Sequence, residues 1–358
     1  SSRELSEAFE NAGIRHGEGG GHTKFTYRGS LLAENLSKAL ELVSKMVLDP
    51  MLPAEEIESV RNALLQDIQA LQDNPAQRTM VELSKRYYPD PFGRPSEGTE
   101  EGILACDRAY MQDEWNRRFG SKGAILSIAG KVEEAEAVEL AERYFGDWSG
   151  SVCERPDFGE MPPHSGAHIP SDSAQMQIAL AYPAPEFSHP MYYTARVANG
   201  VLSGGMFGRL FIEVREKRGL CYSVYSRHSA GRESGAVFAY AGTTPDRAAE
   251  TLEVLVAELR RLPETVSEEE LQRSKANILS SLVIGEESTS ARAVANASDY
   301  WLLGDVRDLD EVKESVKQVT REDIDGYLDA FPASSMMVQT LGPREFDLAP
   351  YAQNGRRS

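Results

Sequence analysis

The feature that most constrains this chain is an internal repeat that relates its two halves. Residues 25–29 (FTYRG) match residues 238–242 (FAYAG), an offset of 213 positions (25 to 238). Matches continue along both halves with shifts of one residue, and Gly130 falls on Gly342. We expect the same order in each half: a strand, a helix stopped by Pro, a long helix, further helices and a final strand, at 124–130 and again at 335–342. Such a repeat predicts two copies of one α+β unit.

The repeat also predicts that the first copy is shorter at its start. Ser1 corresponds to about residue 214. The second half has an expected strand (173–182) and an expected helix (190–202) before that point. We therefore expect the first copy to lack a portion equivalent to roughly 169–213, either because the sequence is a piece of a longer chain or because a precursor is cut. Chemistry carried by that portion lies outside this sequence.

A change of composition suggests where the two copies are joined. Residues 146–170 are dense in Pro, Gly and Ser and show no apolar periodicity. We predict a first domain over 1–150, a linker over 151–170 and a second domain over 171–350. His164 and His168 fall in this stretch, and we interpret both as solvated linker side chains.

Composition excludes several classes of function. A chain of 358 residues is long enough for two or three domains with sizeable cores. The formal charge of −18 argues against a nucleic-acid partner, which would need a basic surface. The three cysteines are too few and too widely spaced for a disulfide framework or a zinc ribbon. No apolar run approaches the ~18 residues of a membrane span. We expect a soluble protein of the cytoplasm or the periplasm.

The most specific local pattern lies at 206–225 (MFGRLFIEVREKRGLCYSVY). It predicts a helix ended by Gly219 and followed by a strand. The apolar stripe of that helix has helical spacing: Phe207, Leu210, Phe211 and Val214. Arg215 then stands near the helix end and Tyr222 at the start of the strand, so that a guanidinium and a phenol can converge on one carbonyl oxygen. The alternative is an exposed helix terminus beside a half-buried tyrosine.

The segment RLFIEVREKRGLCYSVYS resembles the second-domain signature of the M16 metallopeptidases, the family of insulinase, pitrilysin and the mitochondrial processing peptidase. The bacterial M16B group looks closest. The resemblance covers almost the whole chain, including 33–68 (AENLSKALELVSKMVLDPMLPAEEIESVRNALLQDI). It implies two homologous α/β domains that enclose a peptide, the first incomplete at its N-terminus. It also implies that Arg215 and Tyr222 are the family's Arg and Tyr, which contact the substrate carbonyl and stabilise the oxyanion.

The resemblance places the family's zinc motif outside this sequence. That motif is HxxEH on a first-domain helix, with a third acidic ligand on a later helix. This chain has no HxxEH, and its histidines contain no suitable pair: His16, His22, His164, His168, His189 and His228. The third-ligand position aligns with Asp67, where the family usually has Glu, and a supporting glutamate aligns with Val60. We expect no zinc on this chain; a partner chain or the missing N-terminal segment would supply it.

Three functions are compatible with these observations. In the first, the chain is inactive alone and binds peptide or unfolded polypeptide as the oxyanion-stabilising subunit of a homo- or heterodimer with an HxxEH-bearing M16 subunit. In the second, it is a complete M16B zinc endopeptidase whose zinc motif lies in the missing segment. In the third, it is a non-catalytic peptide-binding or scaffold homologue.

Overall fold

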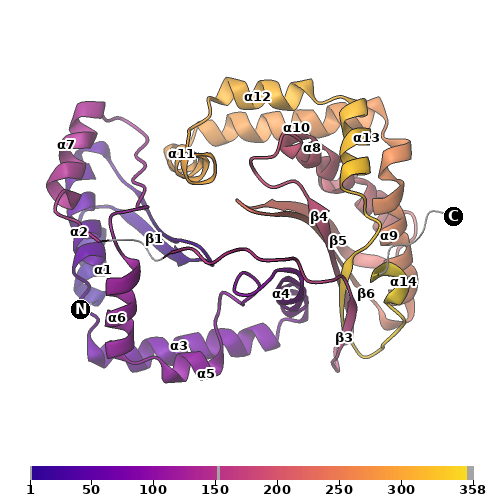
Figure 1. Ribbon diagram of the computed structural model, residues 1–358, viewed down its shortest axis with the longest axis horizontal. Helices are drawn as coiled ribbons and strands as arrows, with labels where there is room; N and C mark the ends of the chain where they lie inside the picture. Colours follow the sequence, from indigo (N-terminus) through magenta and orange to yellow (C-terminus); the bar gives the residue numbers. More distant parts are fainter. Residues whose placement is uncertain (1, 151–153, 353–358) are drawn as a thin grey trace. The chain divides into compact units, whose positions relative to one another are not determined.

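The structure is a computed structural model that describes residues 2–150 and 154–352 (Figure 1). The chain divides into two compact units that alternate along the sequence. Unit 1 comprises Ser1–Ala70, Pro95–Asp157 and Gly285–Trp301. Unit 2 comprises Leu71–Arg94, Phe158–Ile284 and Leu302–Ser358.

Unit 1 combines helices with a two-stranded antiparallel sheet. The sheet pairs β1 (Arg15–Gly20) with β2 (Phe25–Ser30). The helices that lie wholly or mostly in this unit are α1 (Ser2–Asn11), η1 (Ala33–Asn35), α2 (Leu36–Leu48), α3 (Ala54–Gln72), α5 (Glu100–Ala105), α6 (Arg108–Arg118), α7 (Glu134–Phe145) and α11 (Thr289–Leu303). Its buried core is small and is formed by Phe9, Ile14, Ala39 and Leu42.

The prediction of a strand at 124–130 is wrong. These residues have no regular secondary structure, and Ile125 and Leu126 are exposed. The apolar pattern is that of a strand, but a strand is stable only beside a hydrogen-bonded neighbour. Among the described residues of unit 1, only β1 and β2 form a sheet, and neither pairs with this segment.

Unit 2 contains a five-stranded mixed sheet with the order β3-β7-β4-β6-β5. Its strands are β3 (Gly166–Pro170), β4 (Met176–Ala184), β5 (Cys221–Ala230), β6 (Gly235–Thr243) and β7 (Met337–Gly342). Strand β3 runs parallel to β7, and the other neighbours are antiparallel. The expected α+β class is therefore confirmed.

The stretch expected to be an irregular linker carries the edge strand β3. The Nδ1 atom of His168 lies 2.9 Å from Oγ1 of Thr340, and Nδ1 of His164 lies 3.0 Å from Oγ of Ser335. The interpretation of both histidines as solvated was therefore wrong. Pro and Gly suit an edge strand as well as a loop, and only the pairing with β7 distinguishes the two.

Side chains of the sheet alternate between two buried faces. One face of β4 and β6 presents residues such as Ile178 and Val237 to helices α8 (Tyr192–Ser203), α9 (Ala248–Thr265) and α13 (Arg321–Ala330). Figure 1 shows these helices gathered along one side of the sheet. Further helices that lie wholly or mostly in unit 2 are η2 (Gly205–Phe207), η3 (Phe211–Glu216), η4 (Pro245–Arg247), α10 (Glu268–Glu286), α12 (Leu309–Gln318) and α14 (Ala349–Ala352).

The opposite face is covered by α4 (Pro75–Tyr87), which comes from the first half of the sequence. Leu83 and Tyr87 of this helix pack against Phe238 and its neighbours. Arg86 fixes the helix to the sheet, because its guanidinium donates to the carbonyl of Val338 at 2.9 Å and to Ser165. The sheet that carries the candidate site is thus packed on both faces, which makes it a rigid support.

Candidate functional site

Arg215 lies on a π-helix, η3, at the edge of the unit 2 sheet. The expected helix is present, but its hydrogen bonding over Phe211–Glu216 is that of a π-helix. Leu210 and Val214 are fully buried and hold this segment against the core. The Arg215 guanidinium carbon lies 4.8 Å from the ring centroid of Phe211 and 5.1 Å from that of Tyr222. Both contacts fall within the range of a cation–π interaction.

Tyr222 is displayed by a β-bulge at the start of β5. Cys221 pairs with Thr243 of β6 and Ser223 pairs with the next residue, Gly242. Tyr222 is therefore the extra residue of the bulge, and its side chain is 78% exposed whereas Cys221 is buried. Bulges redirect side chains in this way and are frequent beside active sites.

The turn between the two residues is fixed by backbone geometry. Gly219 has φ +60°, the left-handed conformation that the sequence predicted for the residue after the helix. Its N–H donates to the Arg215 carbonyl at 3.0 Å, and the Leu220 N–H donates to the Val214 carbonyl at 3.0 Å. Because of this turn, Arg215 and Tyr222, which are seven residues apart in the sequence, lie in contact.

Strand β5 is held in place along its outer edge by helix α8. The Ser226 N–H donates to Oγ of Ser203 at 3.0 Å, and the Ser226 hydroxyl donates to Oδ1 of Asn199 at 2.8 Å. A side chain of α8 thus satisfies the backbone N–H of Ser226, one of the groups that an edge strand can leave free. This anchoring limits movement of the strand that carries Tyr222.

The buried thiol next to Tyr222 does not contribute a nucleophile. Burial raises the pKa of Cys221 to about 11, against a smaller opposing effect of the Arg215 charge. Cys221 therefore stays protonated at neutral pH, and the thiolate is the reactive form of cysteine. The thiol therefore adds no charge beside Arg215 and Tyr222.

Sequence reasoning missed Phe211 as a member of the site and read it only as part of an apolar stripe. Its ring lies against the guanidinium because Phe211 and Arg215 are four residues apart on one helical face. An aromatic residue four positions before an arginine is a signal that could have identified it. No local signal indicates the β-bulge at Tyr222.

The described side chains do not fit the ligand set of a zinc ion. Tetrahedral zinc takes about three protein ligands, and no three His, Cys, Asp or Glu residues gather anywhere in the described ranges. Asp67 and Val60 are exposed on α3. His228 lies 2.8 Å from the Pro185 carbonyl, so this ring nitrogen already has a partner.

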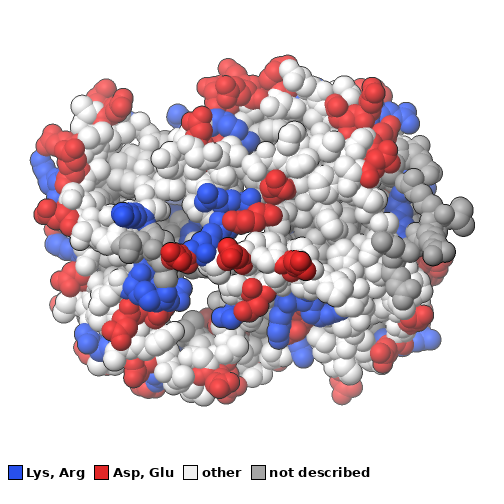
Figure 2. All heavy atoms as spheres, in the orientation of Figure 1, with Lys and Arg blue, Asp and Glu red and all other residues white. Residues whose placement is uncertain are grey.

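The surface carries charged side chains of both signs (Figure 2). The face shown in Figure 2 carries Asp and Glu mixed with Lys and Arg. Within the described residues, no helix has the length and apolar character needed to cross a membrane.

The chain has an α+β fold with Arg215 in contact with Tyr222, and comparisons with known proteins show which family it resembles. Residues 106–278 match the family described as the Peptidase M16 inactive domain. An uncharacterized zinc protease of Rickettsia bellii is 29% identical over 96% of this chain and 83% of its own. One of Bacillus subtilis is 28% identical over 91% of this chain and 80% of its own. Over most of its length the chain is therefore similar to proteins of the M16 peptidase family.

Solved structures show the same fold. A peptidase M16 inactive domain of Pseudomonas fluorescens superposes with a TM-score of 0.85 at 22% identity, covering 95% of this chain and 83% of that one. A protease of Helicobacter pylori gives a TM-score of 0.84 at 18% identity, covering 95% of this chain and 84% of its own.

Proposed function

We propose that this protein is the substrate-binding and oxyanion-stabilising subunit of an M16-type peptidase and acts on peptides or unfolded polypeptides. In this proposal it is inactive alone and complements an HxxEH-bearing M16 subunit, in a homo- or heterodimer. The observation that carries the proposal is the contact of Arg215 with the exposed phenol of Tyr222. The described residues of this M16-like chain do not fit zinc, yet they include this pair of potential donors.

The pair is suited to bind a carbonyl oxygen that gains negative charge. The Tyr222 hydroxyl can donate a hydrogen bond to that oxygen, and Arg215 carries N–H donors in a fixed planar fork. The guanidinium carbon of Arg215 lies over the rings of Phe211 and Tyr222, and these contacts use the charge of the guanidinium rather than its N–H donors. Donors that are positioned before the reaction stabilise a developing charge without reorganising.

A two-domain organisation is part of the proposal, with homologous M16-like domains over 1–150 and 171–350 and a junction at 151–170. In support, β2, α2 and α3 follow one another in the order of β6, α9 and α10. The strands of each trio occupy matching places in the sequence repeat. The zinc of the assembled enzyme would come from the partner subunit or from an N-terminal segment of the same polypeptide.

A second candidate is a complete M16 zinc endopeptidase. It is favoured by the names of the relatives, several of which are called zinc proteases. In that case Arg215 and Tyr222 keep the same roles, and the HxxEH motif belongs to the same polypeptide.

Cleavage assays distinguish the two candidates. The purified protein is analysed for zinc and incubated with unfolded polypeptides, alone and with an HxxEH-bearing M16 subunit from the same source. We expect negligible zinc and turnover alone, and turnover in the mixture that is lost when Tyr222 is replaced. Stoichiometric zinc together with turnover by the single chain would overturn the subunit proposal in favour of the second candidate.

A further inference from the structure

The segment that carries Arg215 has an unusual conformation that needs support from outside. A π-helix is rare, and such segments occur frequently at functional sites. Here it spans six residues, Phe211–Glu216, between Leu210 and the turn at Gly219. If this segment reverted to ordinary α-helical hydrogen bonding, the side chains at its end would turn relative to β5. The position of Arg215 therefore depends on what holds the register of the segment.

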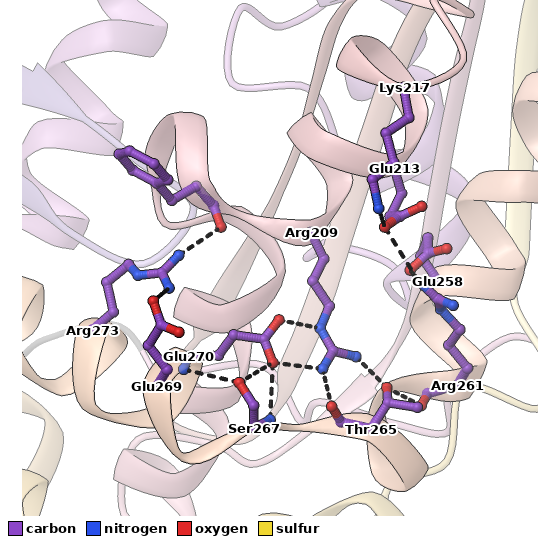
Figure 3. A network of polar contacts seen from close by, with 11 residues as sticks. Arg209, Glu213, Lys217, Glu258, Arg261, Thr265, Ser267, Glu269, Glu270 and Arg273 are labelled. Atoms are coloured by element: carbon purple, nitrogen blue, oxygen red, sulfur yellow. Dashed lines mark hydrogen bonds and ion pairs between the residues drawn. The ribbon is translucent and has the colours of Figure 1, made fainter.

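An ion pair anchors the start of the segment. Arg209 is only 5% exposed, and its guanidinium donates to both carboxylate oxygens of Glu270, at 2.7 and 2.8 Å. The same guanidinium donates to the carbonyl and the hydroxyl of Thr265 (Figure 3). Glu270 in turn accepts from the N–H and the hydroxyl of Ser267, at 2.9 and 3.0 Å. Arg209 thus connects the approach to the π-helix with the corner between α9 and α10.

A second ionic cluster anchors the outer side of the same segment. Glu213 accepts from Lys217 at 2.7 Å and from Arg218 at 2.9 Å. Arg261 of α9 lies 3.8 Å from Glu213 and forms a 2.7 Å ion pair with the buried Glu258. Figure 3 shows the first cluster at Thr265 and Glu270, and the second at Glu258 and Arg261 of α9. Contacts with α9 and α10 therefore flank the π-helix, at Arg209 before it and at Glu213 within it.

Stability alone is a weak reason for burying Arg209. An ion pair taken out of water gains little over well-packed apolar side chains, because its desolvation costs about as much as its attraction returns. Buried ion pairs do fix one conformation among alternatives, because their hydrogen bonds are directional. The segment that follows Arg209 carries Arg215, whose guanidinium lies 5.1 Å from the Tyr222 ring.

We propose that Arg209, held by Glu270 and Thr265, is a positioning residue that keeps the π-helix in register and the Arg215 guanidinium on the Tyr222 ring. The catalytic part of this inference rests on the proposed function; the positioning part concerns the conformation of the chain itself. The hydrogen bonds of Arg209 go to Glu270 and Thr265 rather than to Arg215, so in this proposal it acts through the segment between the two arginines.

The test weakens the Arg209–Glu270 ion pair with substitutions that keep a side chain of similar size in each place. Arg209→Lys keeps the charge but loses the two parallel hydrogen bonds, and Glu270→Gln keeps the shape but loses the charge. The matched control is Lys275→Met on α10, which removes the buried 2.8 Å hydrogen bond to the Lys317 carbonyl away from the π-helix. The full chain is labelled with ¹³C in its tyrosine rings, and the Tyr222 signal is assigned with Tyr222→Phe. Arg215→Ala gives the signal of a Tyr222 ring without its cation.

We expect the Tyr222 signal of Arg209→Lys and Glu270→Gln to move towards that of Arg215→Ala, while Lys275→Met leaves it in place at a comparable loss of thermal stability. In the assembled enzyme kcat would fall about 10- to 100-fold with KM nearly unchanged, the range expected for misplaced groups. An unmoved Tyr222 signal in both anchor variants overturns the positioning role, whatever the activity. A moved signal without cleavage by the wild-type assembly would keep the positioning role and reject the proposed function.

Discussion

The guanidinium of Arg215 lies 5.1 Å from the ring of Tyr222, a contact made possible by the positive φ of Gly219 between the two residues. Arg215 lies on a π-helix, and Tyr222 lies at the bulge of an edge strand. The donor pair is therefore a product of two local irregularities, which are supported by the regular sheet and helices of unit 2.

Tyr222→Phe tests the phenol as an oxyanion donor. We expect kcat of the assembled enzyme to fall about 10²-fold, the usual effect of removing one donor from a developing charge. KM and thermal stability should change little, because the side chain is exposed. Steady-state kinetics with a peptide substrate provide the measurement, and Tyr225→Phe on the same strand is the control. Equal losses in kcat and in peptide affinity would mean that the hydroxyl only binds substrate.

Phe211→Leu tests whether the ring beside Arg215 restrains the guanidinium. Loss of a cation–π contact at a partly exposed site costs about 0.5–1 kcal/mol, so we expect kcat/KM to fall roughly two- to fivefold. Phe207→Leu is the matched control, because that ring lies 5.3 Å from the guanidinium of Arg273 instead. The interpretation fails if both variants reduce kcat/KM to the same extent.

Glu270 makes the stability of the fold depend on acid pH. Burial alone would raise its pKa, but hydrogen bonds from Arg209 and the Ser267 backbone outweigh this effect and lower the pKa to about 2, from an ordinary value of 4.5. A carboxyl with a lowered pKa in the folded state stabilises the fold above its unfolded pKa, and this contribution is lost as the pH falls. We expect the free energy of unfolding to decrease from about pH 4.5 towards pH 2.

Glu270→Gln provides the comparison for that pH dependence. The variant should be less stable at neutral pH, because the buried Arg209 loses its counter-ion. Its denaturant unfolding curves should depend less on pH in the acid range than those of the wild type. Identical slopes would show that Glu270 has no lowered pKa in the folded protein.

Cys221 should resist alkylation in the folded protein. With a pKa of about 11, roughly one thiol in a thousand is ionised at pH 8. We expect iodoacetamide to modify Cys221 about a hundredfold more slowly in the folded chain than in the unfolded chain. Peptide mass spectrometry follows each cysteine separately, and the half-buried Cys106 serves as an internal reference. Comparable rates in both states would exclude a buried, protonated thiol.

The sequence by itself determined the features that depend on residues close together in the chain. The seven-residue separation of Arg215 and Tyr222, the helix before Gly219 and its left-handed conformation follow from local propensity and spacing. The repeated order of a strand, helices and a final strand likewise predicts an α+β fold.

Only the tertiary structure decided the features that depend on contacts between residues far apart in the sequence. The strand-like pattern at 124–130 forms no strand, whereas Gly166–Pro170 becomes one by pairing with β7, 172 positions away (166 to 338). Arg209 and Glu270 are separated by 61 residues, and no local pattern indicates that they meet. Hydrogen-bonded partners, buried ion pairs and the bulge at Tyr222 are set by the packing of the whole unit, because burial and pairing are properties of the fold rather than of any short segment.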